Sequence, residues 1–189
     1  MIDINAIQIM QESQSQKLGL PTYAKIMKGN PQNADFKKLF NSYYGINSAR
    51  RNNKWKDKYY KLFDALYKTS KRKNKKYTFA FILKALYRLT KNVEPSFSSK
   101  MLATLDDSKP IWDKHVLKNL GLKKLKGKDD KSKLNDAIYK YSLIEREYQT
   151  YLRTPHGQCS IDTFDISIPQ QYRSINNIKK LDFLLWSKR

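Results

Sequence analysis

The sequence predicts an all-α fold, arranged as a single compact multi-helix domain. Apolar side chains recur three and four residues apart along most of the chain, which is the period of an amphipathic helix. Glycine and proline residues separate these segments, and runs of strict polar–apolar alternation are scarce. The 189 residues are enough to bury a core. We expect one domain over residues 1–189; if it has two lobes, the terminal helices form one and about 78–150 the other.

The first half of the chain is predicted to contain four helices. A weakly apolar segment covers 5–16, and Asn33 is the expected N-cap of a helix that ends near Gly45. The next helix covers 54–71, where large apolar side chains form a buried stripe. Thr78 is expected to cap a strongly apolar helix at the centre of the core. The stripe of the third helix consists of Trp55, Tyr59, Leu62, Phe63, Leu66 and Tyr67.

The second half is predicted to contain two short helices on either side of 110–113, then a long helix and a terminal helix. The second short helix ends at Gly121, before a lysine-rich link. Asp129 or Asp130 opens the long helix, which ends before Pro155. Residues 155–175 are expected to be irregular, with 161–168 extended. The terminal helix carries Ile178, Leu181, Leu184, Leu185 and Trp186.

Charge is the strongest signal in the composition. The chain has 38 Lys and Arg residues against 17 Asp and Glu, a formal net charge of +21. Repulsion of this size opposes compaction, so we expect a polyanionic partner. Double-stranded DNA is the first expectation and structured RNA the alternative, with binding that weakens as salt rises. The competing interpretation is a lysine-rich surface that reflects overall composition and has no such partner.

Several classes of protein are disfavoured. No run approaches the length of a membrane-spanning helix, and no basic amphipathic helix with a Trp/Leu face stands out, so no membrane partner is expected. The single Cys159 excludes a disulfide framework and suits the cytoplasm, and residues 1–20 lack the apolar core of a signal peptide. No glycine-rich phosphate loop is present, so no cofactor is expected. His115, His156 and Cys159 are too few ligands for a structural zinc, so no metal is expected either.

Basic residues concentrate in two segments. Residues 37–76 contain fourteen Lys and Arg against two acidic residues, and 114–133 contain eight against two. Such clusters bind the phosphate backbone without reading its sequence. The aromatic residues within the first segment are either stacking platforms for unpaired bases or core residues, and their helical spacing favours the core. The predicted nucleic-acid contacts in these segments are Arg50, Arg51, Lys54, Lys71, Arg72, Lys73, Lys114, His115, Lys118, Lys123 and Lys124.

Asp113 is the first candidate for catalytic chemistry. Pro110 stops the preceding helix and fixes the approach of the chain. Asp113 therefore lies at or beside the N-cap of the next helix, where free N–H groups and the helix dipole favour a carboxylate. In the structural interpretation this residue is only a helix cap. In the functional one, Ile111 and Trp112 restrict water around a reactive carboxylate.

The pattern Pro-x-x-Asp-x-His-Val-x-x-x-Leu-Gly-Leu over 110–122 resembles the region around the catalytic aspartate of base-excision DNA glycosylases of the helix-hairpin-helix class. The resemblance implies a helical protein that flips a nucleotide out of the duplex and uses Asp113 as the essential carboxylate. It also implies a possible second activity: in bifunctional members a lysine on the preceding helix forms a Schiff base with the sugar, and Lys100 occupies a comparable place.

The resemblance covers about thirty residues of the chain. The glycine-rich hairpin with which this class binds a phosphate has no counterpart in 93–99, which contains no glycine. Ser96, Ser98 and Ser99, near the start of a helix, are the expected substitutes through their hydroxyls and free N–H groups.

Two functions follow from these observations. The first is a DNA glycosylase with Asp113 as the catalytic residue, and also an abasic-site lyase if Lys100 is a nucleophile. The second is a non-enzymatic, basic nucleic-acid-binding protein on the same helical scaffold. The substitution Asp113→Asn separates them, because it abolishes base release only in the first.

Overall fold

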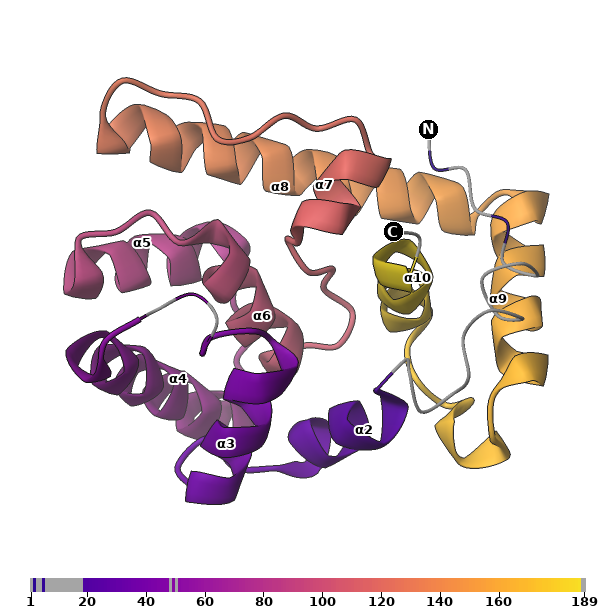
Figure 1. Ribbon diagram of the computed structural model, residues 1–189, viewed down its shortest axis with the longest axis horizontal. Coiled ribbons are helices and arrows are strands. Elements are labelled where there is room, and N and C mark those ends of the chain that lie inside the picture. Colours follow the sequence, from indigo (N-terminus) through magenta and orange to yellow (C-terminus); the bar gives the residue numbers. More distant parts are fainter. Residues whose placement is uncertain (1, 3–4, 6–18, 48, 50, 188–189) are drawn as a thin grey trace. The chain divides into compact units, whose positions relative to one another are not determined.

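The computed structural model describes residues 2, 5, 19–47, 49 and 51–187. Within these ranges the regular elements are α-helices and one 3-10 turn, without any β-strand (Figure 1). The predicted all-α class is therefore confirmed. The first predicted helix, over 5–16, lies almost entirely outside the described residues.

The chain divides into two compact units, and each is described by itself. One unit comprises Pro21–Asp106 and is called the N-terminal unit. The other comprises Met1–Leu20 and Asp107–Arg189 and is called the C-terminal unit.

The N-terminal unit is built around aromatic side chains. Its helices are α2 (Leu20–Lys28), α3 (Ala34–Tyr43), α4 (Asn53–Lys73), α5 (Phe79–Thr90) and α6 (Pro95–Leu105). Helix α5 packs against both α4 and α6, as predicted for a central helix. The rings of α3 and α4 contact one another closely, with Phe40 stacked, tilted or edge-on against five neighbours. These neighbours are Phe36, Tyr44, Tyr59, Tyr60 and Phe63.

The C-terminal unit is organised around its last helix. Its helices are α7 (Lys114–Asn119), α8 (Asp130–Leu152), α9 (Pro155–Ser167) and α10 (Asn177–Ser187), with the 3-10 turn η1 (Gln170–Tyr172) between the last two. Helix α10 contacts α7, α8 and α9, and every residue from Ile178 to Leu185 is buried. This continuous burial includes two lysines and an aspartate, so the core of this unit must satisfy charges as well as apolar groups.

Local capping explains where several helices begin. The Asn52 side chain accepts a hydrogen bond from the N–H of Trp55, Thr78 from Phe81, and Asp129 from Ser132. Thr78 and Asp129 are the caps that the sequence predicts. Asn33 also occupies its predicted N-cap position, although its side chain makes no capping hydrogen bond.

Two helices differ from prediction. Residues 155–167, expected to be irregular, form α9: Pro155 occupies the first turn, where its missing N–H costs nothing, and Thr154 caps the helix. Gly157 is required by packing, because a Cβ built on it would overlap the carbonyl of Tyr151. Helix α2 was not predicted; Pro21 lies in its first turn, where the missing N–H of proline costs nothing.

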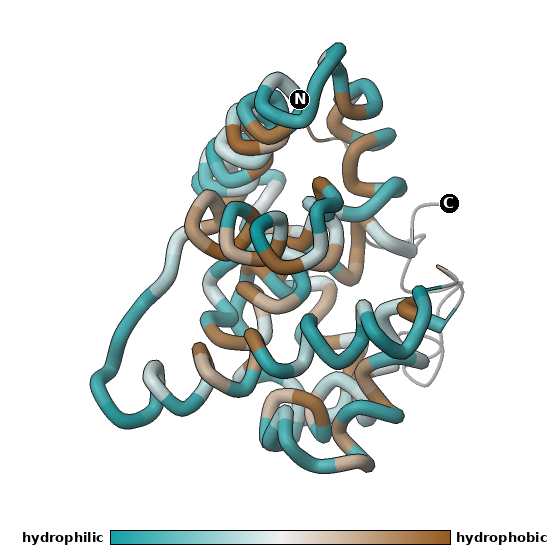
Figure 2. The backbone as a smooth tube through the Cα atoms, turned by 90° about the vertical axis from the view of Figure 1, so that its left-hand side faces the viewer, coloured by the Kyte–Doolittle hydropathy of each residue, from teal (hydrophilic) through white to brown (hydrophobic). Residues whose placement is uncertain are grey.

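Hydrophilic and hydrophobic residues alternate along the helices, as expected of amphipathic helices with one buried face (Figure 2). In the described part of the chain, no helix combines the length and the apolar character that a membrane span requires.

Candidate nucleic-acid interface

Helix α4 carries a row of cations along its outward face. Lys54, Lys61, Lys68 and Arg72 are exposed and follow the spacing i, i+7, i+14 and i+18. On a helix of 3.6 residues per turn this spacing produces a nearly straight line with about 10 Å between successive members seven residues apart. The opposite face holds the buried residues Trp55, Tyr59, Tyr60, Phe63 and Leu66. The four cations are called the α4 row.

Two carboxylates lie near the α4 row, and one of them is already engaged. Asp64 Oδ2 lies 2.9 Å from Lys68 Nζ and accepts a hydrogen bond of 3.2 Å from Gln32 Nε2. The other is Asp57, which is exposed. The row therefore keeps a clear excess of positive charge.

Arg51 and Lys54, two predicted contacts at the start of α4, have different environments. An ion pair of 2.6 Å joins Arg51 Nη2 to Glu94 Oε1, and the guanidinium lies over the rings of Trp55 and Phe97. Burial raises the pKa of Glu94, and the charge and hydrogen bond of Arg51 oppose that shift. Lys54 is exposed. The neighbouring Arg50 lies outside the described residues.

The predicted contacts Lys71, Arg72 and Lys73 form the last turn of α4 and are exposed. Cations at this end also interact favourably with the helix dipole, so they stabilise the helix in the absence of any ligand. The ammonium of Lys71 lies 5.7 Å from the ring centroid of Tyr67. The helix then ends at Asn74 in a left-handed conformation.

Lys100, the predicted Schiff-base lysine, is in the interior of the N-terminal unit. Its side chain is 7% exposed, and its Nζ donates a 3.1 Å hydrogen bond to the carbonyl of Tyr44. The ammonium also lies over the rings of Tyr44 and Phe97. These contacts engage the ammonium and bury it, which is the environment of a structural lysine rather than that of an accessible nucleophile.

Asp113 occupies the predicted N-cap of α7 in the C-terminal unit. Its Oδ1 accepts a 2.9 Å hydrogen bond from the N–H of His115, and the residue is half-buried beside the buried Trp112. Its Oδ2 makes no hydrogen bond to the described residues. Lys100 and Asp113 belong to different units, so each is described by its own surroundings.

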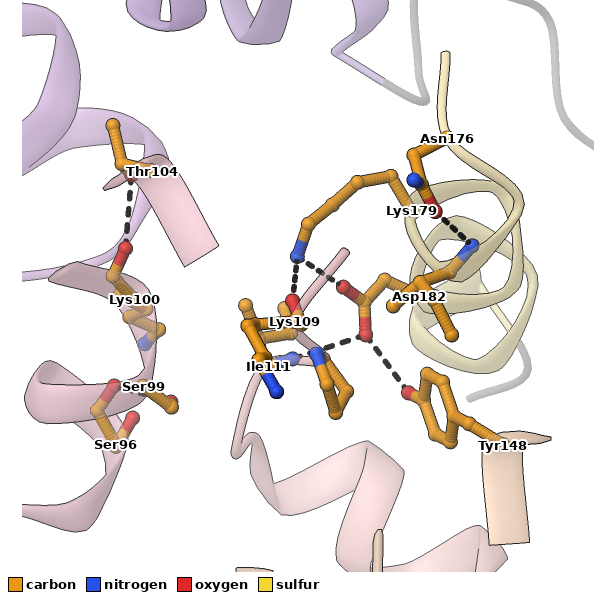
Figure 3. Close-up of polar contacts among 12 residues, drawn as sticks. Ser96, Ser99, Lys100, Thr104, Lys109, Ile111, Tyr148, Asn176, Lys179 and Asp182 are labelled. Carbon is orange, nitrogen blue, oxygen red and sulfur yellow. Dashed lines mark hydrogen bonds and ion pairs between the residues drawn. The ribbon is translucent and has the colours of Figure 1, made fainter. Parts of the chain in front are cut away.

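Ser98 and Ser99, the predicted phosphate ligands, are buried inside α6. The hydroxyl of Ser99 donates to the carbonyl of Ser96 (Figure 3), and the N–H of Ser98 donates to the carbonyl of Glu94. The Ser98 hydroxyl has no partner among the described residues, but it faces the interior. Neither serine is therefore included in the interface proposed below.

The predicted contacts of the C-terminal unit lie on α7 and on the link that follows it. Lys114, Lys118, Lys123 and Lys124 are exposed, whereas His115 is half-buried. The link is tied to α8, because Lys140 Nζ donates to the carbonyl of Lys124 and the N–H of Lys126 donates to Asp136. Several lysines here thus remain on the surface of a fixed segment.

A buried polar cluster in the C-terminal unit was not predicted from the sequence (Figure 3). Asp182, 4% exposed, accepts hydrogen bonds from the Tyr148 hydroxyl at 2.8 Å, Lys179 Nζ at 2.7 Å and the N–H of Ile111 at 3.2 Å. Lys179 also donates to the carbonyl of Lys109. The cluster fastens the segment before Asp113 to α8 and α10. Its hydrogen bonds join residues up to 71 positions apart in the chain. The only sign of it in the sequence is that the apolar terminal helix also contains three charged residues.

Burial dominates the proton equilibria of this cluster. Desolvation raises the pKa of Asp182, while Lys179, Tyr148 and the N–H of Ile111 oppose the shift. Desolvation also raises the pKa of Tyr148 well above its ordinary value, and the Asp182 charge adds to the effect. The tyrosine thus remains a hydrogen-bond donor to a carboxylate.

Among the residues that the structure describes, no group of His, Cys, Asp and Glu has the arrangement of a metal site. Cys159 is exposed and forms no disulfide.

Comparisons of the chain with family models, with curated proteins and with solved structures find no match.

Proposed function

We propose that this chain is a nucleic-acid-binding protein that holds the phosphates of a duplex along the α4 row. The observation that carries the proposal is the alignment of Lys54, Lys61, Lys68 and Arg72 on one exposed face. These residues belong to a unit with twenty Lys and Arg against five Asp and Glu. A line of cations matches a linear polyanion, and its binding releases condensed counterions.

A duplex is favoured over a single strand because three large rings of α4, which lie on the face opposite to the row, are not available for stacking. Trp55, Tyr59 and Tyr60 are buried, and Tyr60 donates a 2.7 Å hydrogen bond to Asn41. Proteins that bind single strands use exposed aromatic side chains as platforms for the bases. Phosphate contacts alone are sufficient to hold a duplex without reading its sequence.

The experiment measures how duplex affinity depends on salt for a variant with all four residues of the α4 row changed to Gln. Each lost phosphate contact is expected to lower the slope of log affinity against log salt by about 0.9, so the slope falls by about 3 to 4. The matched control changes Lys25, Lys84, Arg88 and Lys91, also exposed and in the same unit, and removes the same charge. Equal losses in both variants would show that only net charge matters.

A second function is favoured by the carboxylate of Asp113. One oxygen accepts a hydrogen bond from the N–H of His115, which fixes the orientation of the carboxylate at the N-terminus of α7. A glycosylase requires such a group to stabilise charge on the sugar of a flipped nucleotide. Together with the sequence pattern over 110–122, this supports base excision as the alternative function.

Asp113→Asn tests this alternative cleanly, because Asn caps a helix as well as Asp does. The variant should therefore remain folded and bind duplex normally. An aldehyde-reactive label would then report abasic sites on a panel of plain, damaged and naturally modified duplexes. Label formed by the native protein and lost in Asp113→Asn supports the enzyme; equal label with both proteins contradicts it.

A further inference from the structure

A small pocket lies where the start of α4 meets the end of α5 in the N-terminal unit. It has a volume of about 210 Å³ and contains three cations, contributed by Arg51, Lys54 and Lys58. Asn52 and Asn92 add amide groups, and Trp55 forms part of the wall. No carboxylate lines it. This distinguishes it from the larger pocket between α3 and α4, where Asp57 and Asp64 accompany three lysines.

Two hydrogen-bond donors in this wall lack acceptors. Arg51 Nε and Trp55 Nε1 are buried and have no partner among the described residues, and the Trp55 side chain is 6% exposed. Both nitrogens are enclosed, so a ligand in the pocket does not reach them directly, and they add positive potential to this wall.

The surrounding contacts hold two of the three cations in place. Lys58 Nζ donates a 2.6 Å hydrogen bond to the carbonyl of Leu89, at the end of α5. Arg51 is fixed by Glu94 and by its stacking over Trp55. Helix α4 is 21 residues long, and its N-terminus presents backbone N–H groups and the positive end of the helix dipole to the same region.

We propose that this pocket binds one phosphate group of the nucleic acid, through Arg51, Lys54 and Lys58. The proposal rests on the proposed function and deepens it, because it identifies one contact that is enclosed rather than spread along an open row. A terminal phosphate and a backbone phosphate offer the same oxygens. In both cases the partly enclosed site, to which Lys54 of the α4 row contributes, is screened less by salt than the other three members of the row are.

The test compares two variants with the same loss of charge on the same helix. Lys54→Gln/Lys58→Gln removes two cations of the pocket, and the control Lys61→Gln/Lys68→Gln removes two cations outside it. At about 0.3 M salt the pocket variant should lose about tenfold in duplex affinity, and the control about threefold or less. Equal losses of duplex affinity in the two variants at this salt concentration would overturn the proposed phosphate site.

Inorganic phosphate provides a readout that does not depend on nucleic acid. In the native protein and the control, phosphate should shift the indole N–H resonance of Trp55, assigned by its absence in Trp55→Phe, more than those of Trp112 and Trp186. In Lys54→Gln/Lys58→Gln this shift should be lost. Equal movement of all three resonances, or none, would contradict a site at Trp55. Thermal unfolding of each variant without phosphate verifies that it is folded.

The two proposals fail differently. A native protein without salt-dependent duplex binding overturns the proposed function, even if phosphate still shifts Trp55. Duplexes with 5′-phosphate and with 5′-hydroxyl ends identify the source of the phosphate. If the native protein prefers the 5′-phosphate duplex and the pocket variant does not, the pocket binds a strand end. If the native protein binds both duplexes equally and the pocket variant loses about tenfold in affinity for each, the pocket binds a backbone phosphate.

Discussion

The N-terminal unit contains twenty Lys and Arg residues against five Asp and Glu, whereas the rest of the chain contains eighteen against twelve. In the described part of the C-terminal unit, acidic residues form ion pairs with five lysines, and three of these lysines, Lys140, Lys179 and Lys180, are buried. In the N-terminal unit most cations are exposed and the interior is aromatic.

The difference shows that one chain uses charge for two purposes. In the C-terminal unit, buried ionic groups fix which segments pack together, because each must find its partner to avoid a large desolvation cost. In the N-terminal unit aromatic and aliphatic side chains build most of the core, with Glu94 and Lys100 as its buried charged residues, so most of the cations remain on the surface. The proposed function accordingly belongs to the N-terminal unit.

The largest expected effect tests the aromatic core. Phe40 is fully buried among five rings, so Phe40→Ala should lower the free energy of unfolding by about 3–5 kcal/mol through lost burial and the cavity left behind. Urea unfolding measures the change. Phe81→Ala is the control, since Phe81 is half exposed; a similar loss there would show that the ring cluster is not what holds the unit together.

The next effect tests the buried charges of the C-terminal unit. Asp182→Asn removes the negative charge and leaves Lys179 buried without its counterion, which should cost about 3 kcal/mol. The same urea experiment reports it. Asp162→Asn, at an exposed position of α9, should change stability by less than about 0.5 kcal/mol. A cost below about 1 kcal/mol for Asp182→Asn would mean that the ionic cluster does not organise this unit.

A smaller loss of stability, similar in the two units, is expected when a helix cap is removed. Thr78 caps α5 and Thr154 caps α9, each accepting a hydrogen bond from a backbone N–H three residues later. Replacing either with Ala should cost about 1 kcal/mol in thermal or urea unfolding, whereas Ser should restore most of it. A large inequality between the two would show that capping depends on the charge of the unit, contrary to its local origin.

The smallest expected effect is the dependence of folding stability on pH. Burial raises the pKa of Asp182, against the opposition of Lys179. Its contribution to stability is therefore fully present below the unfolded pKa and is lost as pH rises through the folded one. For Asp136, burial raises the pKa, but hydrogen bonds from Lys140 and the N–H of Lys126 outweigh it and the net pKa is lowered. That contribution is present above the unfolded pKa and is lost as pH falls through the folded one.

Carboxyl carbon resonances followed between about pH 2 and 8 check these directions. Asp182 should titrate above an ordinary aspartate and Asp136 below it. Glu94 in the N-terminal unit should titrate above an ordinary glutamate, because burial raises its pKa. Identical midpoints for Asp182 and Asp136 would contradict the contrast between a fully buried and a half-buried carboxylate.

Most of the helical fold follows from local sequence. The apolar stripe of 54–71 and the caps Thr78 and Asp129 depend on residues within a turn or two, so their helices were predictable. Helix α9 was not, because Pro155 and Gly157 usually interrupt helices. Here the first occupies a position that tolerates proline and the second permits close approach to Tyr151, and only the packed unit reveals that approach.

The candidate site divides in the same way. The sequence alone determined how many cations the chain has. Helical spacing also places Lys54, Lys61, Lys68 and Arg72 on one face, although only Lys54 and Arg72 were predicted as contacts. Only the tertiary structure decided which charges are engaged: Lys100 is bonded to Tyr44, and Asp182 to Tyr148 and Lys179. The physical reason is that helical periodicity is a property of neighbouring residues, whereas burial and ion pairing are set by segments distant in the chain that only folding brings into contact.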